Sequence, residues 1–131
     1  MANYIASART NKFHVKDIAA LEAAMPDDIE VRVESIPDRL VSLLVINSDG
    51  AGWPSMIYDE ASDDYLDWDV ETAVRPHLLD GEWCVTKEVG AEKLRYLIGH
   101  ATAFNNQGDS FCIDLDDIFK LLPEGVSTCD Y

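Results

Sequence analysis

The segment that decides the fold runs from Glu82 to Leu122 and reads EWCVTKEVGAEKLRYLIGHATAFNNQGDSFCIDLDDIFKLL. It contains three runs rich in apolar and β-branched residues, separated by turn signals that include glycine. Strands joined by connections this short pair with one another in antiparallel fashion. The predicted strands are Glu82–Val89, Leu94–Asn105 and Phe111–Asp114, with turns at Gly90–Lys93 and Gly108-Asp109.

A short helix is expected directly after the third strand. Asp114 is a suitable N-cap, and Asp116 and Asp117 place negative charge in the first turn, where it suits the helix dipole. Pro123 ends the helix. Its apolar stripe, which we expect to be buried, consists of Leu115, Ile118, Phe119 and Leu122.

The same two patterns alternate in the N-terminal part of the chain. Strands are expected at Asn3–Thr10, at Ile29–Val33 and at Leu40–Ile46, the last as a central strand covered on both faces. Asp17 is expected to cap a first helix, and a second helix is expected to start at Asp69. Pro76 is expected to end or kink the second helix near Arg75. For residues 1–131 the sequence therefore predicts a single α+β domain. We expect mainly an antiparallel sheet of about five or six strands, with two or three short helices packed on it.

Length and composition indicate an ordinary globular protein. The chain has 131 residues, of which 47% are hydrophobic and 27% are charged. No apolar run approaches the roughly 20 residues that span a bilayer, and residues 1–7 lack the features of a secretory signal. Cys84, Cys112 and Cys129 are odd in number and include no CxxC pair, so we expect neither a disulfide framework nor a zinc site, and no cofactor or metal.

Charge is the strongest functional signal in the sequence. The chain has 25 acidic and 10 basic residues, for a net charge of −15. Solubility alone requires a net charge of magnitude about 2–8. The negative electrostatic field of so acidic a protein repels nucleic acid and anionic membranes and attracts basic protein surfaces. We therefore expect a basic protein partner, with no direct binding to nucleic acid or membrane.

One stretch concentrates this charge. Residues 59–71 contain seven carboxylates and no Lys or Arg. Calcium binding is disfavoured, because the spacing does not match an EF-hand loop and no glycine lies in the run. Two interpretations of the stretch remain. It is either a solvated loop whose aromatic residues enter the core, or a contact surface for basic side chains with aromatic anchors. For the second, the expected partner-binding residues are Asp59, Glu60, Asp63, Asp64, Asp67 and Asp69, with Trp53, Tyr65 and Trp68 as anchors.

No catalytic motif is visible, and we predict no catalytic residues. Gly50-Ala51-Gly52 is followed by Trp53-Pro54 instead of a helix start, so it is no dinucleotide-binding fingerprint. The histidines are scattered, and no nucleophile motif accompanies them. A small-molecule enzyme remains an alternative, and it needs a concave pocket with a titratable group such as His100 or Glu88 beside an apolar wall.

Several segments together resemble a family of small acidic proteins from bacterial phages, plasmids and other mobile elements. They include Ser7-Ala8-Arg9-Thr10-Asn11, Asp49-Gly50-Ala51-Gly52-Trp53-Pro54, Pro76-His77-Leu78, the sequence EVGAEKLRYL from Glu88 to Leu97, and Leu115-Asp116-Asp117-Ile118. The resemblance implies a setting, the bacterial cytoplasm and mobile DNA, and no established activity or site residues. In size and charge the chain is also similar to anti-CRISPR and antirestriction proteins.

The leading hypothesis is a non-enzymatic inhibitor that occupies a basic, nucleic-acid-binding surface of a host defence protein by mimicking DNA. A second hypothesis is an immunity protein that neutralises a basic toxin. It would bind through the same electrostatic attraction and differ only in its partner. A structural or regulatory domain of a mobile element is the plainest alternative. The sequence leaves the oligomeric state, monomer or homodimer, open.

Overall fold

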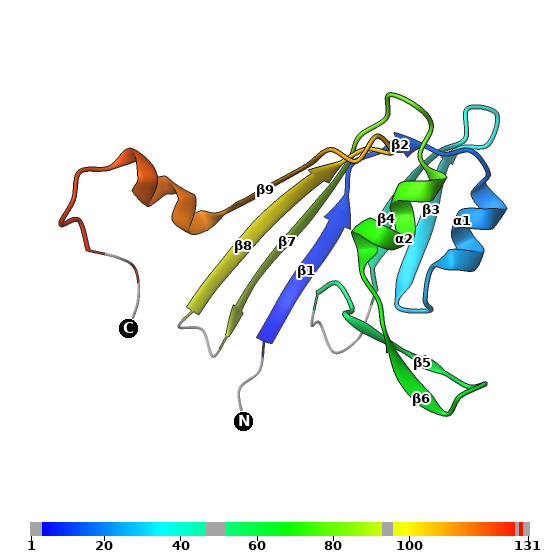
Figure 1. The fold of residues 1–131 in the computed structure, drawn as a ribbon, viewed down its shortest axis with the longest axis horizontal. Helices are drawn as coiled ribbons and strands as arrows, with labels where there is room; N and C mark the ends of the chain where they lie inside the picture. The colour runs from blue at the N-terminus through cyan, green and yellow to red at the C-terminus, as the bar shows by residue number, and fades with distance from the viewer. Residues whose placement is uncertain (1–3, 47–51, 93–95, 128, 130–131) are drawn as a thin grey trace.

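The computed structural model of the chain describes residues 4–46, 52–92, 96–127 and 129 (Figure 1). Its strands are β1 (Tyr4–Thr10), β2 (Phe13–His14), β3 (Ile29–Ser35), β4 (Leu40–Val45), β5 (Met56–Asp59), β6 (Asp64–Asp67), β7 (Cys84–Glu92), β8 (Tyr96–Phe104) and β9 (Ser110–Asp114). Its helices are α1 (Ile18–Ala24), α2 (Val70–Val74) and the 3-10 helices η1 (Arg75–His77) and η2 (Leu115–Leu121). The predicted α+β class is confirmed; the parts of the predictions that concern residues 3, 47–51 and 93–95 lie outside the described residues.

The main sheet has seven strands, and every pairing in it is antiparallel. Its order is β2-β4-β1-β7-β8-β9, with β3 paired to the other edge of β4. β1 pairs with β7 from Tyr4 to Thr10 but meets β4 only where Arg9 lies opposite Leu44. The sheet therefore has a short half, β2-β3-β4, and a long half, β1-β7-β8-β9, that meet at the end of β1 (Figure 1).

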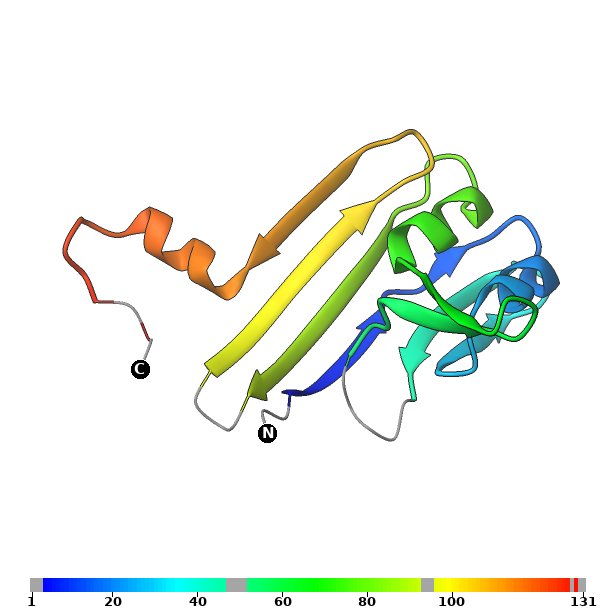
Figure 2. The same ribbon diagram turned by 60° about the horizontal axis from the view of Figure 1, so that its bottom comes forward.

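The hydrophobic core lies where the helices pack on the short half and the adjoining ends of β7 and β8 (Figure 2). As predicted, Asp17 caps α1 by accepting a hydrogen bond from Ala19 N at 3.0 Å. The second helix, α2, starts where expected, and Asp69 caps it by accepting from Thr72 N. α2 ends at Val74, just before Pro76. β4 is the central strand expected, with its middle residues fully buried. The core residues are Phe13, Val15, Leu21, Ile29, Val41, Leu43, Val70, Val74, Leu78, Cys84 and Phe104.

Gly90 lies inside β7, and not in the turn where the sequence placed it. β7 continues to Glu92, and Gly90 is paired with Ala6 of β1. A Cβ atom at position 90 would lie 2.6 Å from the Ala6 Cβ and would overlap the backbone carbonyl of Ile5. Glycine is required here because β1 approaches β7 closely, a reason that a sequence pattern does not distinguish from a turn.

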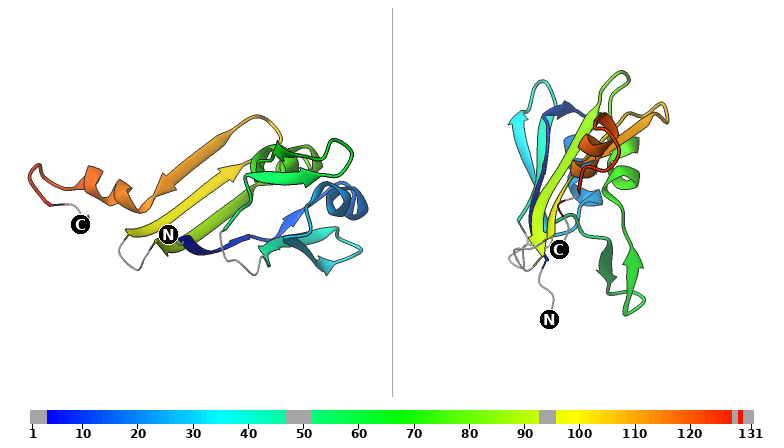
Figure 3. Two further views of the ribbon diagram at one scale, coloured as in Figure 1. Left: turned by 90° about the horizontal axis from the view of Figure 1, so that it is seen from below. Right: turned by 90° about the vertical axis from the view of Figure 1, so that its left-hand side faces the viewer.

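Most of the acidic stretch lies in a β-hairpin formed by β5 and β6, where the sequence predicted no strands. The hairpin is a separate two-stranded sheet. It projects from the body on the same side of the main sheet as α2 (Figure 3). Its two ends are held together at the base by a hydrogen bond from Trp68 N to Ser55 O at 2.9 Å.

The prediction of a buried stripe on the C-terminal helix is wrong. η2 is capped by Asp114 as expected, but it runs past the end of the sheet and away from the core (Figures 1 and 2). Of the predicted stripe, Leu115 and Ile118 are more than half exposed, Leu122 is exposed and Phe119 is half-buried. Apolar periodicity indicates which side chains share a face, whereas the direction in which the helix leaves β9 decides what that face packs on.

Candidate functional site: an acidic hairpin and the cleft at its base

The hairpin is ordered by contacts among its own side chains. Tyr58 lies opposite Tyr65, and the two rings meet edge to face with centroids 5.5 Å apart. The Tyr58 hydroxyl donates a hydrogen bond to Asp63, which raises the pKa of Tyr58 above its ordinary value. Asp63 itself has a φ of 53°, in the left-handed region that Asp tolerates better than most residues. The acidic turn thus has a defined conformation.

The hairpin carries concentrated and uncompensated negative charge. Five of the six predicted acidic site residues lie on it: Asp59, Glu60, Asp63, Asp64 and Asp67. Asp59 and Asp64 are directly opposite each other, an arrangement that destabilises an antiparallel pair by up to about 1 kcal/mol. Within the described ranges, no ion pair involves a carboxylate of the hairpin. A basic partner would relieve this repulsion.

A groove of about 470 Å³ runs between the hairpin and the turn that precedes β3. Asp27 and Asp28 of that turn are exposed, and Glu60 faces the same groove from the hairpin. The groove therefore gathers carboxylates from two segments far apart in the sequence next to apolar and aromatic surface. Its lining is Pro26, Asp27, Asp28, Met56, Ile57, Tyr58, Glu60 and Tyr65.

The three predicted aromatic anchors differ in exposure. Tyr65 is exposed on β6, as is Leu66, and Met56 and Tyr58 are exposed on β5. Trp53 and Trp68 are half-buried and pack against the hydrophobic core. The exposed tyrosines are compatible with a contact surface, whereas the two tryptophans pack on the core as the alternative interpretation expects.

A second concave site, a cleft of about 310 Å³, lies at the base of the hairpin between α2 and the main sheet. Its sheet wall holds Glu88, which is 8% exposed, and His100, whose Nε2 lies 3.2 Å from Glu88 Oε2. Glu88 Oε1 also accepts a hydrogen bond from Trp53 N at 2.7 Å. Glu88 and His100, the titratable residues that the hypothesis of a small-molecule enzyme requires, thus lie together beside the indole rings of Trp53 and Trp68.

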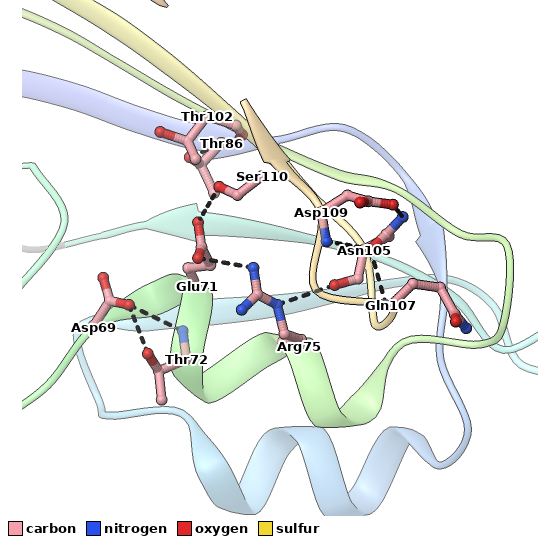
Figure 4. Close-up of polar contacts among 10 residues, drawn as sticks. All are labelled: Asp69, Glu71, Thr72, Arg75, Thr86, Thr102, Asn105, Gln107, Asp109 and Ser110. Atoms are coloured by element: carbon pink, nitrogen blue, oxygen red, sulfur yellow. Dashed lines mark hydrogen bonds and ion pairs between the residues drawn. The ribbon is translucent and has the colours of Figure 1, made fainter. Parts of the chain in front are cut away.

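The carboxylates on the helix side of this cleft have structural partners (Figure 4). Asp69, the sixth predicted acidic site residue, accepts hydrogen bonds from the backbone N–H and hydroxyl of Thr72. Glu71 accepts from Arg75 Nη2 at 2.8 Å and from Ser110 Oγ at 2.9 Å. The Arg75 Nε in turn donates to Asn105 O at 3.0 Å. These bonds tie α2 to the turn between β8 and β9.

Sequence reasoning missed Asp27, Asp28 and Tyr58 as parts of one site. The first two directly follow Pro26, in a combination of residues that signals a turn and nothing further. Only the fold brings that turn beside the hairpin. The one local signal was a pair of adjacent aspartates in a turn, which many solvated turns share.

Comparisons of the chain with protein-family models, with curated proteins and with solved structures found no match. Among the described residues, no group of three or more His, Cys, Asp and Glu side chains is arranged to hold a metal ion. Nor does any described helix have the length and apolar composition needed to cross a membrane.

Proposed function

We propose that this protein is a non-enzymatic binding protein whose acidic hairpin and adjoining groove occupy a basic surface of another protein. The observation that carries the proposal is the groove itself, where Asp27, Asp28 and Glu60 from separate segments converge next to exposed tyrosines. Arginine and lysine side chains fit such a site, because carboxylates attract the charge and aromatic rings pack on the stem or the guanidinium plane.

The proposal favours the groove over the cleft at the hairpin base. Glu71, Asp69 and Glu88 of the cleft are each engaged by backbone or side-chain donors that hold the fold together. Among the described residues, the side chains of Asp28 and Glu60 have no such partner. Charge that the fold does not use is available to a partner.

The partner class follows from the charge and from the resemblance to proteins of mobile elements. A projecting hairpin whose carboxylates lie at the end of β5, in the turn and on β6 presents negative charge much as a phosphate backbone does. We propose that the partner is a nucleic-acid-binding protein, in the setting of a bacterial host a defence nuclease, and that this protein blocks its nucleic-acid site. Association should be fast and should weaken as salt rises.

The test is a pulldown from bacterial host lysate with the protein as bait, followed by elution with salt or with duplex DNA. A captured protein that duplex DNA displaces supports DNA mimicry. Capture of a basic protein that salt releases and DNA does not displace indicates the immunity alternative. Absence of any salt-sensitive partner contradicts the proposal.

The matched variants have equal charge and differ in position. Asp28→Lys/Glu60→Lys reverses two groove carboxylates, and Glu22→Lys/Glu30→Lys reverses two exposed carboxylates on α1 and β3. Asp63 is unsuitable, because its positive φ disfavours lysine. The groove variant should lose the partner, and the control should keep it. Equal loss in both would mean that net charge, and not the groove, drives binding.

A second candidate, a small-molecule enzyme, is favoured by one observation, the pairing of Glu88 with His100 in the wall of the cleft. A carboxylate that orients an imidazole is a frequent arrangement for a general base. A thermal-shift screen with nucleotides, sugars and amino acids tests it. Stabilisation that His100→Ala abolishes would support this function, and a flat screen would remove it.

A further inference from the structure

The long half of the sheet has one face that the described elements leave largely uncovered, apart from Leu115 of η2, which packs over Gly99, and Trp83, whose ring stacks on Phe111. Successive side chains of a strand point to opposite faces, so directly paired residues of β1, β7, β8 and β9 share a side. One side faces α2 and the cleft, and we call the other the uncovered face. On it Val89 is 62% exposed, Leu97 73%, Phe111 65% and Ile113 63%. It comprises Ile5, Ser7, Arg9, Val85, Lys87, Val89, Ala91, Leu97, Gly99, Ala101, Ala103, Phe111 and Ile113.

This face differs from the rest of the molecule in charge. Its described residues include no carboxylate, although the chain has 25 of them, and the charged ones among them are Arg9 and Lys87. At one end of the face, Arg9, Lys12 and Lys87 line a groove of about 540 Å³ together with Val85. A smaller groove of about 190 Å³ follows, with Val89, Ala101 and Ile113 in its wall. An apolar patch this continuous on a soluble protein marks an interaction site.

The fold also provides a segment of complementary character, the arm, which we define as η2 with Leu122. In a 3-10 helix side chains three residues apart align, so Leu115, Ile118 and Leu121 form one apolar row. These three are 55%, 54% and 80% exposed. Asp116 supplies an exposed carboxylate beside the row. The arm thus combines apolar side chains with negative charge, as the uncovered face combines apolar side chains with positive charge.

Beyond Leu115, which packs over Gly99, the arm cannot cover the face of its own chain without losing contacts that fix its direction. η2 begins at the residue after β9 ends, with no linker. A capping box joins the two, because Asp117 N donates to Asp114 Oδ1 at 3.1 Å and Asp114 N donates to Asp117 Oδ2 at 2.7 Å. Leu115 packs over Gly99, where a Cβ would approach its Cγ to 3.0 Å. The arm consequently extends outward from the sheet (Figures 1 and 2).

We propose that the occupant of the uncovered face is the arm of a second copy of this chain, in a reciprocal two-fold dimer. In the described chain β9 pairs only with β8, so its outer edge is open, and the arm starts at that edge. A copy placed along the edge receives the arm on its uncovered face and returns its own arm. Lys87 and Arg9 then meet Asp116 of the other copy, and each contact occurs twice, as an isologous interface requires.

Sedimentation equilibrium tests the proposal with the full chain. The expected result is a dimer for the unaltered protein and a loss of at least tenfold in dimer affinity for either Val89→Lys, on the face, or Ile118→Asp, on the arm. The matched control is Leu66→Asp, an exposed apolar residue of the hairpin, which should dimerise normally. Circular dichroism verifies that each variant is folded. A monomer at about 100 μM, a concentration well above a micromolar Kd, overturns the proposal.

Mixing distinguishes an exchanged arm from other dimers. Val89→Lys retains an intact arm and Ile118→Asp retains an intact face, so an equimolar mixture should form heterodimers through one remaining contact. Lys87→Glu should weaken the dimer, and Asp116→Lys in the same chain should restore it. If the mixture stays monomeric and the double variant is no tighter than the single one, a different surface forms the dimer.

This interface is independent of the proposed partner site. The hairpin lies on the opposite side of the sheet from the uncovered face (Figure 3). Because the interface is mainly apolar and both copies carry net negative charge, dimerisation should persist in about 0.5 M NaCl, where binding to a basic partner is screened. Failure of one measurement therefore leaves the other intact.

Discussion

The hydrogen bond between Glu88 and the backbone of Trp53 fastens the segment that leads into the hairpin, and Glu88→Ala tests that role. Glu88 lies on β7, nearly buried, and accepts from Trp53 N at 2.7 Å. Gly52, with a φ of 81°, passes so close to this carboxylate that a Cβ there would overlap it. Loss of the carboxylate therefore leaves the Trp53 N–H without its acceptor and opens space beneath the chain.

The size of the effect follows from these contacts. A hydrogen bond from a backbone N–H to a partly buried carboxylate contributes about 1.5–3 kcal/mol. His100 adds less, because its side chain is 38% exposed and solvent screens the pair. We expect Glu88→Ala to lower the free energy of unfolding by about 2–3 kcal/mol. For an m-value of about 2 kcal/mol/M, the urea midpoint then falls by about 1–1.5 M.

The assay is equilibrium urea unfolding followed by far-UV circular dichroism and by tryptophan fluorescence. Glu30→Ala, an exposed carboxylate on β3, is the control and should change stability by less than about 0.5 kcal/mol. Glu88→Gln keeps an oxygen acceptor and should fall between the two. If Glu88→Ala is no less stable than Glu30→Ala, the carboxylate does not fasten the Trp53 segment and the reasoning is wrong.

Three further predictions concern other parts of the fold. Gly90→Ala should destabilise by about 2–3 kcal/mol or more in urea unfolding, because its Cβ would meet the backbone of β1; an unchanged midpoint would refute the close approach. Burial alone would raise the pKa of Glu82, but hydrogen bonds from the backbone N–H and the imidazole of His14 outweigh it, and the pKa is lowered. The ionised carboxylate therefore stabilises the folded protein above about pH 4.3, and this stabilisation is lost as pH falls through the lowered pKa. Glu82→Gln should accordingly be less stable than the unaltered protein at pH 7, with the difference shrinking between about pH 5 and 3, and a pH-independent difference would contradict the linkage. Burial also raises the pKa of the Cys84 thiol, so a thiol reagent should label the two exposed cysteines at once and Cys84 only on unfolding.

Local patterns in the sequence predicted the elements well, because the relevant forces act within a few residues. The caps at Asp17 and Asp114, the helix start at Asp69 and the stop at Pro76 are all present. Strands with alternating or continuous apolar residues were found close to their expected bounds. The hairpin escaped prediction because its strands pair with each other and bury little, so no hydrophobic alternation marks them.

The site depended on tertiary proximity and was only partly predictable. Seven carboxylates in residues 59–71 drew attention to the hairpin from composition alone. The groove, in contrast, needs the turn before β3 to lie beside β5, and the cleft needs β7 paired to β8 so that Glu88 meets His100. Whether the apolar row on η2 is buried depends on the direction in which η2 leaves β9. None of these relations leaves a trace in spacing along the chain.

The closed base of the hairpin has a consequence for how the protein can change over evolutionary time. Trp68 N and Ser55 O hold the two ends together, and the strands beyond them form no part of the main sheet. Insertions, deletions or wholesale replacement beyond this point leave the hydrophobic core and its folding untouched. The sequence and length of the hairpin can therefore diversify rapidly while the scaffold that carries it stays constant.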